Sequence, residues 1–138
     1  TLDNVYKRAK MQSVRTLLNV RKKELMKELT QEQFERIMKE TKETGGCTFE
    51  NFEVVHYSSG YQVATTNNTA TESNISEIRK ALEATNGNGG TWLDTSTGEL
   101  FIDSSHHVNS LAVAIHEGLK YKQRSIWDWS AMDEIKVK

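Results

Sequence analysis

The chain has 138 residues, of which 36% are hydrophobic and 27% charged, and its formal net charge is -1. A chain of this length can form one domain with its own core, so folding requires neither disulfides nor a structural metal. No apolar run approaches the roughly 20 residues of a membrane span, and no charged-then-apolar leader opens the sequence. The single cysteine, Cys47, has no partner for an internal disulfide. We therefore expect a cytoplasmic protein in a reducing compartment, with no membrane partner.

The small net charge conceals an uneven distribution. Residues 1–23 hold seven basic residues and one acid, a balance of +6, whereas the remainder holds 11 basic and 18 acidic residues, a balance of -7. Two explanations stay open: a basic arm that binds nucleic acid or an acidic protein surface, or an ordinary solvated helix face. The candidate binding residues of the arm are Arg8, Lys10, Arg15, Arg21, Lys22 and Lys23.

The N-terminal part of the chain is expected to be helical. Residues 2–29 contain neither glycine nor proline and place apolar side chains at helical spacing. Such a helix would be about 40 Å long, so it either bends near Arg21 or projects and covers its apolar stripe against another chain. A second helix is expected after Thr30, with Gln33 completing a capping box, and should end at residues 45–46. This pattern predicts a helical hairpin or elbow that mediates a homodimer.

Past these glycines the sequence becomes rich in β-branched and aromatic residues. Residues 49–57 and 60–66 predict a hairpin with a turn at residues 58–60, followed by a polar loop at residues 67–73. A second hairpin is expected over residues 91–103, where two apolar runs flank a turn that contains a glycine.

The remaining elements complete a mixed fold. They are a helix capped by Ser73 or Asn74 and ending at residues 86–90, a linker at 104–109, a helix capped by Asn109 or Ser110, and strands at 125–129 and 134–138. The order ββαββαββ predicts an α+β fold, in which an antiparallel sheet has its helices on one face. We expect an N-terminal helical region at residues 1–46, with the basic arm at 1–23, and an α+β domain at residues 47–138.

No catalytic or metal-binding motif is visible in the sequence. The four histidines are His56, His106, His107 and His116. They show neither the His-Glu-x-x-His pattern nor the i, i+4 spacing that aligns two metal ligands on a helix. Cys47 has no neighbouring base in the sequence, and no serine lies in a Gly-x-Ser-x-Gly elbow. Asp94 and Asp103 flank the second hairpin, where Asp94 is more naturally a turn residue. We expect no catalytic residue, metal or cofactor.

Tryptophans provide a second set of candidate binding residues. Trp127 and Trp129 are two residues apart in an expected strand and therefore share one face. If Ile126 points into the core, both tryptophans point away from it and form exposed or partner-covered anchors. If the tryptophans are inside, as is usual for this residue, Ile126 and Asp128 face outward.

Three segments resemble a module of phage and prophage proteins. They are GYQV at residues 60–63, GTWLDTSTGELFIDSS at residues 90–105 and QRSIWDW at residues 123–129. The resemblance covers about residues 60–135 and implies a viral or mobile-element origin and a bacterial host cytoplasm. It implies no catalytic residues. Small free-standing proteins of this origin are often inhibitors of host defence, for example anti-CRISPR proteins, which is an argument by association.

Three functions are consistent with these features. The first is a non-enzymatic phage or mobile-element protein that binds and inhibits a bacterial host defence complex. The second is a nucleic-acid-binding protein that uses the basic arm. The third is a sponge that sequesters a small nucleotide signal, or an enzyme that degrades one. The corresponding partners are a host protein or protein complex, a nucleic acid and a small nucleotide.

Overall fold

The computed structural model describes residues 4, 5, 7, 8, 10 and 28–138. Residues 4, 5, 7, 8 and 10 are helical and exposed. At the other end of the predicted first helix, Glu28 and Leu29 are described but are not helical, and Leu29 is buried in the core. The remaining residues of that helix, and with them the hairpin or elbow and the dimer contact, lie outside the described residues.

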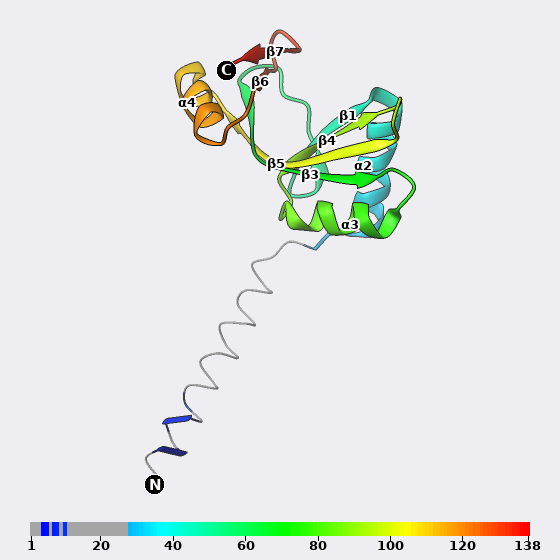
Figure 1. Ribbon diagram of the computed structural model, residues 1–138, viewed down its shortest axis with the longest axis vertical. Helices are drawn as coiled ribbons and strands as arrows, with labels where there is room; N and C mark the ends of the chain where they lie inside the picture. The colour runs from blue at the N-terminus through cyan, green and yellow to red at the C-terminus, as the bar shows by residue number, and fades with distance from the viewer. Residues whose placement is uncertain (1–3, 6, 9, 11–27) are drawn as a thin grey trace.

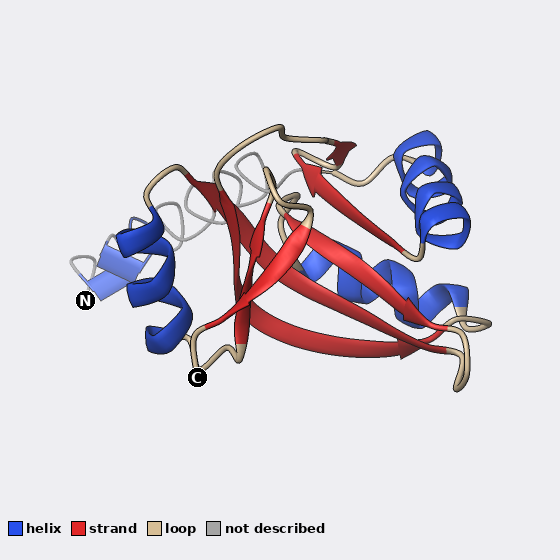
Figure 2. Cartoon of the chain, turned by 90° about the horizontal axis from the view of Figure 1, so that it is seen from above, coloured by secondary structure: helices blue, strands red, loops and turns tan. Residues whose placement is uncertain are grey.

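Within residues 28–138, seven strands form one antiparallel sheet in the order β2-β1-β4-β5-β3-β6-β7. Figure 2 shows the twisted sheet in red with the helices in blue. The strands are β1 (Gly46–Glu50), β2 (Glu53–Val54), β3 (Tyr61–Thr71), β4 (Gly89–Asp94), β5 (Glu99–Val108), β6 (Ser125–Asp128) and β7 (Asp133–Lys136). The helices of this part are α2 (Gln31–Thr44), α3 (Ile75–Ala84) and α4 (Leu111–Lys120). The predicted α+β class is confirmed.

The helix boundaries follow local capping signals. The amide of Gln33 donates to Thr30 Oγ1 at 3.1 Å, and the amide of Thr30 donates to Gln33 Oε1 at 3.0 Å, which is the predicted capping box. α2 ends at Thr44 and is capped by Gly45, whose φ of 89° lies in the left-handed region that glycine adopts without strain. Asn74 and Ser110 cap α3 and α4.

The predicted hairpin between residues 49–57 and 60–66 is wrong. The chain turns at Asn51 and Phe52, both with positive φ, so that β1 pairs with the two-residue β2. Phe52 is fully buried against Phe49, and its amide donates to the carbonyl of Gly87 at 2.9 Å. Burial of this ring therefore stabilises a turn that a phenylalanine rarely adopts. β3 lies elsewhere in the sheet, separated from β1 by β4 and β5.

Two segments predicted to be irregular are strands. β3 continues through the expected loop at residues 67–73 as far as Thr71, and β5 continues through the expected linker at residues 104–109 as far as Val108. The two extensions pair with β5 and β3 respectively, with a register shift between Ala64 and Thr66. Polar side chains are compatible with these strands because only one face of the sheet is covered by helices.

The helices cover one face of the sheet, as predicted. Along β5, alternate side chains point to the same face, and Leu100 and Ile102 are fully buried in the core beneath α2 and α3. Further along that face, His106 contacts Glu117 of α4. Figure 1 shows α4 beside β6 and β7, away from α2 and α3. A smaller core of Val63, Ala114 and Ile126 lies there, so two adjoining cores share one face of the sheet.

α2 belongs to the larger core, although its sequence position groups it with the N-terminal helices. Phe34 and Ile37 of α2 pack in the same cluster as Leu100 and Ile102. None of the helices in the described part of the chain combines the length and the apolar character needed to cross a membrane.

Replacing Thr30 with alanine should lower the free energy of unfolding by about 1 kcal/mol, because the amide of Gln33 loses its acceptor. Thr30→Ser keeps the hydroxyl and should retain most of this free energy. Urea denaturation followed by tryptophan fluorescence measures both variants. An equal loss in the two variants would show that the hydroxyl does not cap the helix.

Candidate functional site

The candidate site lies on the face of the sheet opposite the helices, which we call the uncovered face. Strand alternation and pairing assign side chains from four strands to it. These are Thr48 and Glu50 from β1, Gly90 and Trp92 from β4, Phe101, Asp103, Ser105 and His107 from β5, and Gln62 from β3. This face therefore gathers polar and aromatic groups from segments that are far apart in the sequence.

A cavity of about 300 Å³ opens on the uncovered face. The polar residues that line it are Thr48, Glu50, Tyr57, Gln62, Asn88, Ser105, His106 and His107. Tyr57 comes from the segment between β2 and β3, which reaches over the ends of β1 and β5. The volume lies at the lower end of the range for small-ligand sites, about 300 to 1,000 Å³.

An aromatic cluster forms one wall of the cavity. The rings of Tyr57 and His107 stack with 3.9 Å between centroids and 19° between planes. Trp129 meets Tyr57 edge-on at 5.6 Å and Trp127 at 6.4 Å. Such offset and edge-on pairs stabilise a fixed arrangement beyond the effect of burial alone.

This cluster shows how the two predicted tryptophans are placed. Ile126 is 2% exposed and lies in the core, so the alternative in which Trp127 points away from the core applies. Trp129 is nevertheless only 6% exposed, because Tyr57 and Trp127 lie against it. The structure thus brings Trp127 and Trp129 into contact with each other, and Trp129 lies against the Tyr57 ring that lines the cavity.

A chain of hydrogen bonds runs from Trp129 to the floor of the sheet. Trp129 Nε1 donates to Gln62 Oε1 at 3.3 Å, and Gln62 Nε2 donates to Ser105 Oγ at 2.9 Å. Ser105 and the amide of Gly90 hydrogen-bond to the carboxylate of Asp103. Burial raises the pKa of Asp103 to about 6, and these two hydrogen bonds only partly oppose the shift. A carboxyl group that titrates near neutrality therefore lies beneath the uncovered face.

Hydrogen bonds of His107 and Tyr57 hold the segment between β2 and β3 in place over the cavity. His107 Nε2 is 2.8 Å from the carbonyl oxygen of Ser59. The neighbouring Gly60 has a φ of 84°, and a Cβ there would lie 2.3 Å from His107 Nε2, so only glycine fits. The hydroxyl of Tyr57 donates to Glu50 Oε2, which raises the pKa of Tyr57.

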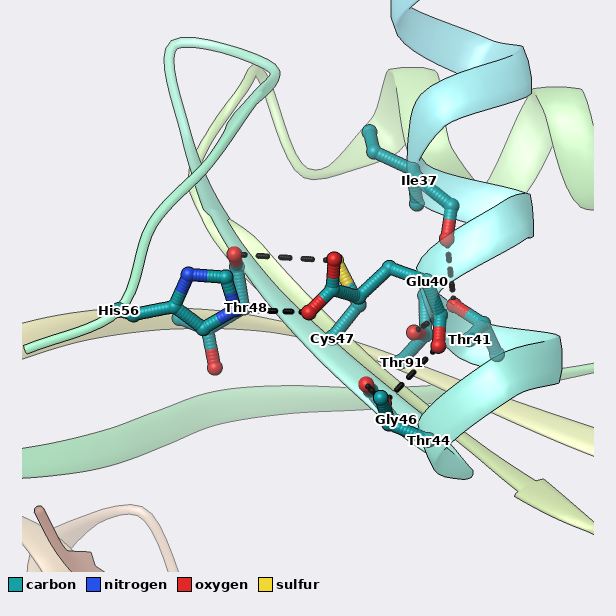
Figure 3. Close-up of polar contacts among 9 residues, drawn as sticks. All are labelled: Ile37, Glu40, Thr41, Thr44, Gly46, Cys47, Thr48, His56 and Thr91. Atoms are coloured by element: carbon teal, nitrogen blue, oxygen red, sulfur yellow. Dashed lines mark hydrogen bonds and ion pairs between the residues drawn. The ribbon is translucent and has the colours of Figure 1, made fainter.

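Cys47 belongs to β1 but does not line this cavity, and its side chain lies beside α2 (Figure 3). Its side chain is 8% exposed, and Sγ is 3.7 Å from the carbonyl oxygen of Thr48. Burial, with a smaller effect of Glu40, raises the pKa of the thiol to about 12, and Arg36 opposes this only weakly. Because the thiolate is the nucleophilic form, this environment suits a structural cysteine.

The four histidines are dispersed. His56 pairs with Glu40 at 2.7 Å (Figure 3), His106 pairs with Glu117 at 2.5 Å, His107 lines the cavity, and His116 is exposed on α4. Among the residues that the structure describes, no group of three or more His, Cys, Asp or Glu side chains is arranged to hold a metal ion.

Only part of the predicted basic arm falls within the structure. Arg8 and Lys10 are helical and exposed. The other candidate residues of the arm lie outside the described part of the chain; they are Arg15, Arg21, Lys22 and Lys23.

Sequence reasoning missed the cavity itself. Glu50 and Tyr57 were assigned to the first predicted hairpin, and Gln62 to its second strand, which placed them in the wrong pairing. The adjacent His106 and His107 were a usable signal for a site on the sheet. Neighbouring residues of a strand point to opposite faces, so one histidine of the pair had to lie on the face without helices. Comparisons with protein-family models, with curated proteins and with solved structures gave no match. The functional argument therefore depends on the geometry of the uncovered face.

Asp103→Asn should change how stability depends on pH. The folded-state pKa of Asp103 lies above the unfolded value, so its contribution to stability is complete below about pH 4 and is lost as pH rises through about 6. The shift of about two units corresponds to about 3 kcal/mol. The variant should therefore gain up to this amount relative to the wild type between pH 4 and pH 7, measured by urea denaturation.

Asp94→Asn is the matched control for this experiment. Hydrogen bonds from Ser96 lower the pKa of Asp94, so its contribution is present above the unfolded pKa and lost as pH falls. Its removal should change the pH dependence in the opposite sense. A pH-independent difference between Asp103→Asn and the wild type would contradict the burial of an ionisable carboxyl group.

The native protein should react with a thiol-specific disulfide reagent much more slowly at pH 8 than the urea-unfolded chain does. Burial suppresses both the access of the reagent to Cys47 and the formation of its thiolate. Absorbance of the released chromophore measures the two rates. Equal rates in the folded and unfolded states would show that Cys47 is accessible.

Proposed function

We propose that the chain is a non-enzymatic binding protein that recognises a protein partner with its uncovered face. We further propose that it comes from a phage or another mobile element and inhibits a bacterial host defence complex. The resemblance of residues 60–63, 90–105 and 123–129 to a phage module supports the origin. The arrangement of aromatic groups on the uncovered face supports the mode of action.

The observation that carries this proposal is the position of Trp92. Its side chain is 57% exposed, yet its ring packs on Phe101 with 5.1 Å between centroids and 31° between planes. The indole is therefore held in one place while most of its surface remains available. Tryptophan is enriched among the few residues that supply most of the binding energy of protein interfaces.

Trp92 and the cavity lie on the same face of neighbouring strands. Trp92 pairs with Phe101, and two residues away on each strand Gly90 pairs with Asp103, which hydrogen-bonds to Ser105 of the cavity. A partner that covers Trp92 can therefore also reach the cavity. This continuity favours a protein surface over a small isolated ligand.

The other two functions have less support from the described residues. Around Trp92 and the cavity, the side chains assigned to the uncovered face include no lysine or arginine. Within the described strands, Lys136 at the β7 edge is the one cation that pairing places on this face, so it offers little charge for a phosphate backbone. Nucleic-acid binding would depend on the basic arm, of which Arg8 and Lys10 are exposed. The described residues that line the cavity likewise include no lysine or arginine to pair with a nucleotide phosphate.

Trp92→Ala should weaken partner binding at least tenfold, because the anchor of the interface is lost. Affinity-tagged wild-type protein should capture a stoichiometric protein complex from a bacterial lysate and inhibit it after purification. Ile75→Ala is the control, since Ile75 is also an exposed apolar side chain but lies on α3. Equal capture by Trp92→Ala and the wild type would remove the uncovered face from the interface. Capture of no stoichiometric complex would refute the proposed function.

A further inference from the structure

We propose that the cavity is a receptor for an arginine side chain of the partner, with Glu50 as the acceptor of the guanidinium group. This inference rests on the proposed function, because it assigns the arginine to a protein that covers the uncovered face. The inference identifies the chemical group that the cavity binds, whereas the exposed Trp92 indicates only that a partner covers this face.

The charge of the cavity favours a cation. Among the described residues that line it, Glu50 is the one carboxylate, and no lysine or arginine is present. Asp103 lies beneath the same face and connects to the lining through Ser105. A cationic group that enters here therefore meets an attractive field, whereas a phosphate or carboxylate is repelled.

Glu50 is held in place before any ligand arrives. Its Oε2 accepts the hydroxyl of Tyr57, and within the described chain no hydrogen bond to Oε1 is formed. Tyr57 is fixed in turn by its stack on His107 and its edge contact with Trp129. The free oxygen therefore has a defined position, and little side-chain entropy is lost when it binds a donor.

The shape and lining of the cavity favour arginine over lysine. A guanidinium group is planar, presents several N–H donors in a fixed fork, and packs well against aromatic rings. The cavity combines an aromatic wall formed by Tyr57 and His107 with the carboxylate of Glu50. The amide oxygens of Gln62 and Asn88 also line it, and each already accepts one hydrogen bond, from Trp129 Nε1 and from the amide of Asn51 respectively. A lysine ammonium would interact with Glu50 but would gain less from the planar wall.

The experiment titrates the 15N-labelled full chain at pH 8 with N-acetyl-arginine-methylamide, a probe that isolates the side chain from any peptide charge. We expect saturable chemical-shift changes at the amides of Gln62 and Ser105 and at the indole N–H of Trp129, with a dissociation constant on the order of millimolar. The citrulline analogue has nearly the same shape without the charge, and it should bind at least fivefold more weakly.

Glu50→Gln tests the acceptor. Glutamine retains an oxygen for the hydroxyl of Tyr57, so the aromatic wall should remain, and the shifts caused by the arginine probe should fall at least fivefold. Glu99→Gln is the control, because Glu99 pairs with Asp94 at the far end of the same face and its loss changes the net charge equally. Similar binding by the wild type and Glu50→Gln, or by the arginine and citrulline probes, would overturn the inference.

Other occupants give distinct results that would also overturn it. Shifts at the cavity caused by inorganic phosphate, but not by the arginine probe, would indicate an anion site. Shifts of the same amides on dilution of the protein alone would assign the cavity to a second copy of the chain. If the arginine probe does not bind but Trp92 is still required to capture a partner, the arginine site fails while the proposed function stands.

Discussion

The pairing of β3 with β5 is the contact on which the rest of the structure depends. These two strands are the longest of the described chain, and they run side by side from Tyr61 opposite Val108 to Thr71 opposite Glu99. On one face they connect the core beneath α2 and α3 to the smaller core beneath α4. On the other face they supply Gln62, Ser105 and His107 to the cavity. One strand pair therefore fixes both the stability of the fold and the geometry of the site.

The one-sided cover of the sheet explains why polar chemistry collects where it does. α2, α3 and α4 all contact the face that holds Leu100 and Ile102, so its side chains are apolar or, like His106 with Glu117, paired with a polar group of a helix. The opposite face is free to hold Gln62, Asp103 and Ser105 in a connected hydrogen-bond chain. Burial within this network raises the pKa of Asp103 to about 6, although the helices lie on the other face of the sheet.

Local signals in the sequence were sufficient to predict α2, α3, α4 and the second hairpin. Thr30, Asn74 and Ser110 satisfy the first amides of their helices whatever the rest of the fold does, and the turn before Glu99 is likewise set by its own residues. The first hairpin could not be predicted in this way. Phe52 adopts a positive φ because its ring is buried by distant residues, and β3 finds its partner far along the chain. The cavity depends on that same non-local pairing, and for this reason the sequence did not reveal it. The buried position of Trp129 depends on its contact with Tyr57, and no local sequence pattern connects these two residues.

The short strands at the two edges of the sheet have a consequence for how the protein meets other molecules. β2 has two residues and β7 has four, and both contain acidic side chains. Edges this short and charged offer few backbone groups to an incoming strand, so extension of the sheet by another chain is disfavoured. A partner is thereby directed away from generic backbone pairing and toward side chains on the broad face. Recognition of that kind is selective, because it depends on which residues the partner presents rather than on its ability to form a strand.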